Sequence, residues 1–156
     1  MNRLLALLAV LFALAAPACT NLLVGKKASK NGACFITYSA DSYGMYGRML
    51  HYPAGKHAPG TMRKIVDGDT HKPLGEIPEA PYTYNVVGNI NEHQVAITET
   101  TFGGREELWP KNPVGGIDYV SLMALGLQRA KTAREAIRVM TDLVARYGYA
   151  SEGESF

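Results

Sequence analysis

The pattern of apolar and polar positions predicts two β-hairpins followed by two helices. The first hairpin is expected from β-rich runs at residues 20–26 and 33–39, which flank the turn-forming pair Asn31-Gly32. The second is expected from runs at 82–89 and 94–102, in which apolar residues alternate with small or polar ones. This order of elements favours an α+β fold with helices layered on an antiparallel sheet.

Both predicted helices have recognisable ends. Asp118 is placed to cap a helix that runs to about Arg129. Thr132 and Glu135 have the spacing of a capping box, and Gly148 is placed to end the second helix. Apolar residues on one face of this second helix are expected to pack: Ala133, Ala136, Ile137, Met140, Leu143, Val144 and Tyr147.

Between and after these elements the pattern is weaker. Five of the eight prolines fall within residues 51–82, where only residues 61–66 have the pattern of a strand. We therefore expect a long ordered loop there, of the kind that shapes binding sites. Residues 147–156 resemble a turn entering another strand, so the chain is expected to be the front part of a longer protein.

The first 18 residues have the form of a signal peptide. Arg3 is followed by the uncharged apolar run 4–15 and by Ala16-Pro17-Ala18, with small residues where a signal peptidase cuts. The run is shorter than the roughly 20 residues of a membrane span. Cleavage after Ala18 leaves Cys19 as the first residue of an exported protein without stable membrane insertion.

Composition limits the remaining chain to one domain. Removal of 18 residues from 156 leaves 138, and removal of Arg3 leaves 15 basic residues against 14 acidic ones. This balance argues against nucleic acid as the partner. The hydrophobic content of the whole sequence, 47%, is that of a globular protein with one core. Whether the protein forms a homo-oligomer stays open.

Cys19 is the residue with the most distinctive chemistry. An N-terminal cysteine carries its own base, because an α-amine has a reference pKa of about 7.7 to 8.0 and can take up the thiol proton. Two alternatives are a disulfide with Cys34, which an exported protein permits, and acylation of Cys19 as a lipid anchor. The residues before Cys19 fit the lipid-attachment pattern poorly.

A catalytic N-terminal cysteine also needs a group that orients its amine. Asp41 follows the second predicted strand, and a hairpin brings the end of that strand back toward Cys19. The alternative for Asp41 is an ordinary turn or cap at the strand exit.

Three segments carry a resemblance to a known family: "ACTNLLVGKKASKNGACFITYSADSYGMYG", "GNINEHQVAITETTFGG" and "YGYASEGESF". They resemble the dipeptidase A family of cysteine peptidases, which are N-terminal nucleophile hydrolases related to bile-salt hydrolases and penicillin V acylases. The resemblance implies a four-layer αββα sandwich that is incomplete in this chain. It also implies hydrolysis of short peptides, with no cofactor and with residues 19–156 as the N-terminal portion of the peptidase domain. A related amidase activity is the alternative.

By this resemblance Cys19 is the nucleophile and Asp41 holds its amine. Related amidases have an arginine where this chain has Tyr38, which is assigned to substrate binding. Counting ten positions from Asn91, as in the amidase motif, reaches Thr101 as an oxyanion-hole residue, although Gln94 stands where the motif has glycine. Thr101 serving only a strand edge is the alternative. The family's second oxyanion asparagine is expected beyond residue 156.

Two further sets of polar residues are candidates for binding. Asn91 is assigned to substrate binding and, with Glu92 and Glu152, is placed to meet the charged ends of a peptide; solvated turns are the alternative. A metal site is not expected, because the spacings of the candidate ligands match no ligand motif. Those candidates are His51, His57, His71, Asp67 and Asp69.

Overall fold

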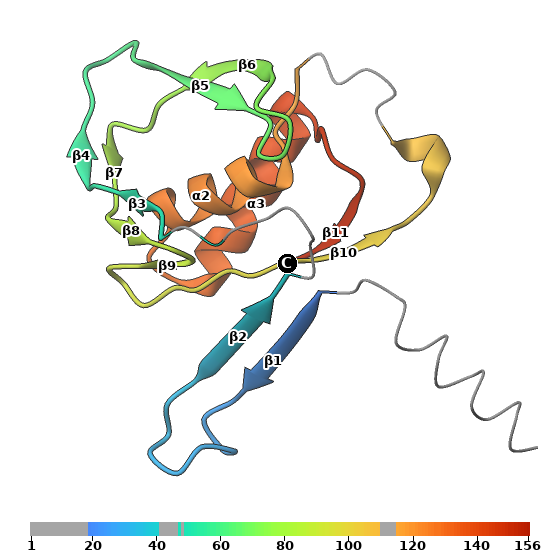
Figure 1. Cartoon of the computed structure of the whole chain (residues 1–156). Helices are drawn as coiled ribbons and strands as arrows, with labels where there is room; N and C mark the ends of the chain where they lie inside the picture. Colours follow the sequence, from blue (N-terminus) through green and yellow to red (C-terminus); the bar gives the residue numbers. More distant parts are fainter. Residues whose placement is uncertain (1–18, 41–46, 48, 110–114) are drawn as a thin grey trace, which may run out of the picture. The chain divides into compact units, whose positions relative to one another are not determined.

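The computed structural model describes residues 19–40, 47, 49–109 and 115–156 (Figure 1). The chain divides into two compact units, Met1–Tyr46 and Gly47–Phe156, and each is described by itself. The predicted signal peptide, residues 1–18, lies outside the described residues, as does Asp41.

The first unit contains the predicted N-terminal hairpin. Strands β1 (Thr20–Val24) and β2 (Phe35–Ser39) pair antiparallel, with Thr20 opposite Ser39 and Val24 opposite Phe35. In the connection Gly32 adopts a φ of 72°, a left-handed conformation that glycine tolerates well. The hairpin prediction is confirmed.

The second unit begins with short antiparallel strands in residues 51–91. The paired strands are β3 (His51–Tyr52) with β8 (Val86–Val87), β8 with β9 (Ile90–Asn91), β4 (Gly55–Lys56) with β7 (Tyr82–Thr83), and β5 (Met62–Val66) with β6 (Pro73–Pro78). The predicted strand at 61–66 is therefore confirmed as β5, and the prediction that the rest of residues 51–82 forms a loop is wrong. Strand β6 escaped the pattern because prolines are unfavourable within strands; here they stand at its two ends, Pro73 and Pro78.

The second predicted hairpin is confirmed only around its turn, where Ile90 and Ala96 form an isolated antiparallel bridge and the N–H of Ile97 donates to the carbonyl oxygen of Asn89 at 3.0 Å. Its two predicted runs do not pair along the rest of their length. The run at 82–89 divides between β7 and β8, and the chain reverses between β8 and β9, where Gly88 adopts a φ of 55°. Strand β10 (Thr100–Gly103) pairs instead with β11 (Gly153–Ser155), far along the chain (Figure 1). Alternation identifies a strand but does not identify its partner. The predicted strand at the end of the chain is confirmed.

Both helices are confirmed with their caps. Helix α2 (Tyr119–Arg129) starts after Asp118, whose carboxylate accepts from the backbone N–H of Val120 and of Ser121. Helix α3 (Ala133–Tyr147) starts after Thr132 and is followed by Gly148 at a φ of 84°. The apolar face of α3 is narrower than predicted: Ala136, Met140 and Leu143 are buried, but Ile137 is 62% exposed and Ala133 is also exposed.

The core of the second unit lies around the pair of helices, which run side by side in Figure 1. Its fully buried members include Val86, Ile117 and Leu125. Helices and several small antiparallel sheets are compatible with the expected α+β class. The 3-10 turn η1 (Glu106–Leu108) completes the elements. In the described part of the chain, no helix has the length and apolar character needed to cross a membrane.

Candidate active site

Cys19 lies at the start of the N-terminal hairpin, directly before β1. Its Sγ is 3.9 Å from the Oη of Tyr38, a residue of the neighbouring strand β2. The pairing of Thr20 with Ser39 accounts for this contact, because Cys19 comes directly before Thr20 and Tyr38 directly before Ser39, which makes them diagonal neighbours across the two strands. The structure therefore places two of the predicted site residues within contact distance.

The other cysteine takes no part in this contact. No disulfide joins Cys19 to Cys34, both of which belong to the described chain, and Cys34 is exposed. Cys19 is half-buried. The two thiols thus differ in environment, which makes Cys34 a useful control for the chemistry of Cys19.

Thr101 belongs to the second unit, on strand β10. Its hydroxyl donates a hydrogen bond of 2.8 Å to Oε1 of Glu154, the residue directly opposite on β11. The close approach of the strands requires glycine at position 153, because a Cβ there would lie 2.7 Å from the ring of Phe102 and 2.9 Å from the carbonyl oxygen of Gly103. Thr101 is exposed, but its hydroxyl is held across the sheet.

A second acidic residue, Glu99, lies next to the carboxyl that accepts this hydroxyl. Glu99, two residues before Thr101, is only 3% exposed, and Glu154 is half-buried. Burial, together with the neighbouring Glu99 carboxyl, raises the pKa of Glu154 to about 7. A carboxyl group with that pKa exchanges its proton near neutral pH.

Asn91 occupies the core side of strand β9 and is 5% exposed. Its Nδ2 donates to the carbonyl oxygens of Leu127 (2.8 Å) and Ala130 (2.7 Å), at the end of α2. Its Oδ1 accepts from the backbone N–H of His93 (3.0 Å) and of Val95 (3.0 Å). These contacts support a structural role, and the assignment of Asn91 to substrate binding stays a prediction.

Gln94 explains part of the departure from the amidase motif. Its φ is 62°, in the left-handed region where glycine is favoured over other residues. The turn after Asn91 thus has the backbone conformation that suits the motif's glycine, although the residue here is glutamine.

Four of the five candidate metal ligands, His51, His57, Asp67 and Asp69, have other side-chain partners. His51 bonds to Asn85 (2.8 Å) and His57 to Thr83 (3.0 Å). Asp67 accepts from the backbone N–H of Thr70, the largest cause of its lowered pKa, in a local turn. Among the described residues no group of three or more potential ligands could hold a metal ion.

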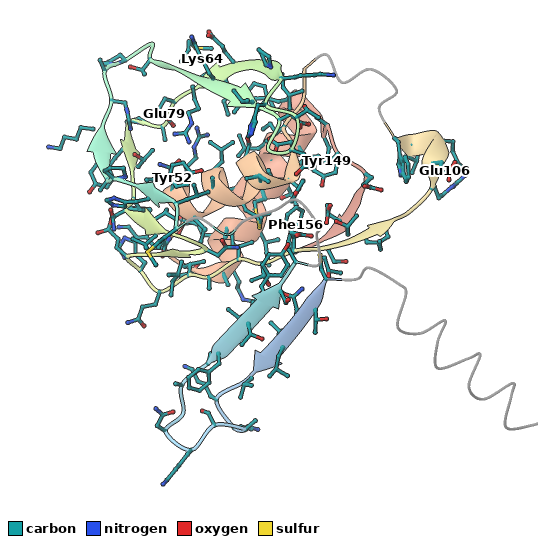
Figure 2. All side chains as sticks on the ribbon, viewed as in Figure 1. Tyr52, Lys64, Glu79, Glu106, Tyr149 and Phe156 are labelled. Atoms are coloured by element: carbon teal, nitrogen blue, oxygen red, sulfur yellow. The ribbon has the colours of Figure 1, made fainter. Side chains whose placement is uncertain are left out.

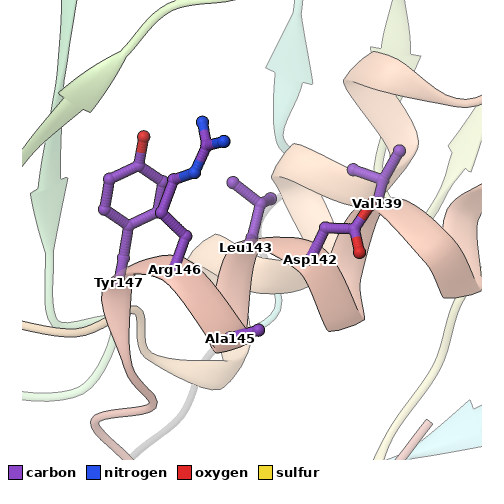
Figure 3. Close-up of a pocket in the computed structure, with 6 residues that line it drawn as sticks. All are labelled: Val139, Asp142, Leu143, Ala145, Arg146 and Tyr147. Atoms are coloured by element: carbon purple, nitrogen blue, oxygen red, sulfur yellow. The ribbon is translucent and has the colours of Figure 1, made fainter.

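A pocket of about 580 Å³ lies along α3 (Figure 3). Its lining side chains all come from this one helix: Val139, Asp142, Leu143, Ala145, Arg146 and Tyr147. It contains none of the predicted site residues, so it does not mark the candidate active site.

Sequence reasoning did not single out Glu99 and Glu154. A signal was present, because Glu99 continues the two-residue spacing of the buried Val95 and Ile97. A carboxyl on the apolar side of an extended segment indicates a special environment. No comparable pattern marks Glu154, whose contacts come from pairing across 53 residues of chain.

Comparisons with known proteins match most of the chain. The family model described as Peptidase family C69 matches residues 18–156. A curated protein from Latilactobacillus sakei, described as a probable dipeptidase, is 31% identical over 150 residues. The match covers 85% of this chain and 31% of that protein, so the chain spans about a third of the length of the curated relative. No solved structure matches significantly.

Proposed function

The chain belongs to peptidase family C69, and on that premise we propose that the whole protein hydrolyses dipeptides with Cys19 as its N-terminal nucleophile. The observation that carries the proposal is the coincidence of two independent features at one residue. The family match begins at residue 18, and the signal-peptide pattern predicts a cut directly before Cys19. Export follows from the same pattern.

The proposed reaction has two halves. The α-amine of the processed Cys19 takes the thiol proton, and the sulfur attacks the carbonyl carbon of the peptide bond. The tetrahedral intermediate collapses, the C–N bond breaks, and the α-ammonium gives its proton to the leaving amine. Water then attacks the thioester and passes a proton to the α-amine; as the thioester C–S bond breaks, that proton returns to the sulfur and restores the thiol.

Three other residues have roles in this proposal. Asp41 orients the α-amine, and Thr101 stabilises the oxyanion through its backbone N–H or its hydroxyl. Tyr38 lies 3.9 Å from the Cys19 sulfur, measured to its hydroxyl oxygen, where it can contact the substrate next to the scissile bond. Because related amidases have an arginine at this position, Tyr38 favours a peptide substrate over an amidase substrate.

The proposed architecture goes with the reaction. We assign the whole domain to the four-layer αββα sandwich, with residues 19–156 as its first portion. The exposed apolar residues of the N-terminal hairpin support this, since Leu23 is 73% exposed and Phe35 is 52% exposed. Further layers of a sandwich would cover such residues.

The experiment compares two forms of the full-length protein. One begins at Cys19, and the other retains a single additional residue, Ala18, before it. The added residue converts the α-amine to an amide, which is not basic near neutral pH, so turnover of a panel of unmodified dipeptides should fall by about 10² to 10⁴. Mass spectrometry after the assay checks that the extended form has stayed extended.

Two cysteine variants complete the test. Cys19→Ala should remove the hydrolysis and remain folded, whereas Cys34→Ser, a change of the other and more exposed thiol, should leave the turnover rate unchanged. Equal rates for the processed and extended forms would show that another base serves Cys19. Equal loss in both cysteine variants would point to structural damage rather than to a nucleophile.

A further inference from the structure

The contact between Thr101 and Glu154 is part of a larger arrangement on strands β10 and β11. Glu154 lies opposite Thr101 and accepts its hydroxyl at 2.8 Å. Glu99 precedes Thr101 by two residues, the spacing at which side chains of an extended chain project to the same side. One oxygen of Glu99 and one of Glu154 are shielded from solvent. The two carboxyl groups therefore come together with one oxygen of each away from solvent, although the hydrogen bond that Thr101 donates to Glu154 is itself exposed.

Two ionised carboxylates are unfavourable in such a place. Removing charge from water is costly, and the repulsion between like charges is strong where water does not screen it. A single proton resolves both problems, because one carboxyl then donates to the other. The hydrogen bond between Glu99 and Glu154 contributes to the raised pKa of Glu154, after burial as the largest cause.

We infer that Glu99 and Glu154 share one proton, and that this carboxyl pair positions Thr101 for the reaction. The inference rests on the proposed function, in which Thr101 serves the oxyanion. In the protonated state Glu154 donates to the Glu99 carboxylate through one oxygen and accepts the Thr101 hydroxyl through the other. When the proton leaves to solvent, the two carboxylates repel and move apart, and Thr101 moves with Glu154, because its hydrogen bond favours the ionised Glu154 and is kept.

The groups facing the pair come from three other parts of the unit. Glu152 precedes β11 and adds negative charge, which favours the protonated state. Tyr149 follows α3 (labelled in Figure 2), and Tyr119 begins α2. The pKa values of both phenols are raised, with burial as the largest cause in each, so both phenols are neutral throughout the pH range of the pair.

The first experiment follows the pair directly, without any assay of activity. Carbon NMR of the full chain labelled at glutamate carboxyls should show one group titrating near pH 7, and the Thr101 amide signal should move with the same midpoint. Thr101→Val identifies that amide signal. In Glu154→Gln the glutamine keeps an oxygen for Thr101 and supplies an N–H toward Glu99, so neither titration should remain.

Glu152→Gln is the matched control. It removes the same charge from the adjacent stretch of chain but leaves both members of the pair, so the carboxyl and the Thr101 amide should still titrate together. Because a negative neighbour is removed, the midpoint should move to lower pH. Loss of the titration in Glu152→Gln would show that the proton belongs to Glu152, and would overturn the inference that Glu99 and Glu154 share it.

The second experiment measures dipeptide turnover against pH. Titration of the Cys19 α-amine raises the turnover rate with pH in both proteins alike, so their rates are compared as a ratio. The turnover rate of the unaltered protein divided by that of Glu154→Gln should fall as pH rises through about 7, a limb that belongs to the carboxyl pair. Glu152→Gln should retain the limb. A merely structural role of Glu154 would change the rate equally at every pH.

The possible failures are distinguishable. A Thr101 amide that does not titrate near pH 7 would overturn the carboxyl pair, whatever the enzyme does. The Thr101 amide of the unaltered protein could titrate as expected while the turnover rates of the unaltered protein and Glu154→Gln depend on pH in the same way. That result would overturn the positioning role. An unaltered protein that hydrolyses no dipeptide would overturn the proposed function, while the NMR titration would still decide whether the pair exists.

Discussion

Asn91 provides the sharpest test of how this chain is held together. Its side chain links the turn after β9 to the end of α2 through four hydrogen bonds, to Leu127, Ala130, His93 and Val95. Three of these bonds are fully buried, namely those to Leu127, Ala130 and Val95. Replacement of Asn91 by alanine leaves these three backbone groups without the side-chain amide of Asn91, and water cannot reach them to take its place.

The expected cost follows from counting those partners. Each buried polar group left without a hydrogen bond costs about 1 to 3 kcal/mol. With about 1.3 kcal/mol for each of three groups, Asn91→Ala should lower the free energy of unfolding by about 4 kcal/mol. That is a large share of the roughly 5 to 15 kcal/mol that stabilises a typical domain.

Asn89→Ala is the matched control. The side chain of Asn89 donates a hydrogen bond of 3.0 Å from its Nδ2 to the carbonyl oxygen of Ile97, and that bond is only partly buried. Its loss should cost about 1 kcal/mol. With a denaturant slope of about 2 kcal/mol per molar urea, the unfolding midpoint should fall by about 2 M in Asn91→Ala and by about 0.5 M in Asn89→Ala.

A second variant isolates half of the network. Asn91→Asp keeps oxygens for His93 and Val95 but turns an oxygen toward the carbonyls of Leu127 and Ala130, so at neutral pH it should destabilise at least as much as alanine. Urea unfolding followed by circular dichroism measures all three variants. A midpoint for Asn91→Ala no lower than that of Asn89→Ala would refute the counting of buried partners.

Two further predictions concern charges. Asp41→Asn should lower the turnover rate by about 10² or more with little effect on substrate binding, because the Asp41 carboxylate acts on the catalytic amine. An unchanged turnover rate in a folded variant would show that Asp41 is only a turn residue. Glu79 (labelled in Figure 2) pairs with Arg63 at 3.2 Å and Arg129 at 2.9 Å. Burial opposes its charge, but the Ala80 N–H and both guanidinium groups prevail and hold its pKa below the ordinary 4.5. Its stabilising effect is therefore present above about pH 5 and lost as pH falls through the lowered pKa. Glu79→Gln should remove this acid dependence and lower the free energy of unfolding by about 3 kcal/mol at neutral pH. Urea unfolding at several pH values measures both effects. If stability fell at acid pH as much in the variant as in the unaltered protein, other carboxyl groups would be responsible for that loss.

Local signals in the sequence identified the elements that depend on nearby residues. Asp118 and Thr132 cap their helices through backbone groups two or three positions away, and Asn31-Gly32 turns the N-terminal hairpin between strands close in sequence. The contact between Cys19 and Tyr38 follows from that hairpin, since its register decides which residues of β1 and β2 meet. Such interactions involve short loops, so the residues that make them can be recognised in one segment.

Tertiary structure alone decided the pairings over long distances. Strand β10 pairs with β11 rather than with the run before it, and Asn91 proved to be buried against α2 instead of exposed in a turn. The alternation that marks Thr100–Gly103 as extended suits any partner strand, and an asparagine looks the same in a solvated turn and in a buried network. Burial and the satisfaction of backbone polar groups make that choice, and both depend on the whole chain. For the same reason the sequence marks Glu99 as a carboxyl on an apolar face, whereas only the pairing of β10 with β11 brings it to Glu154.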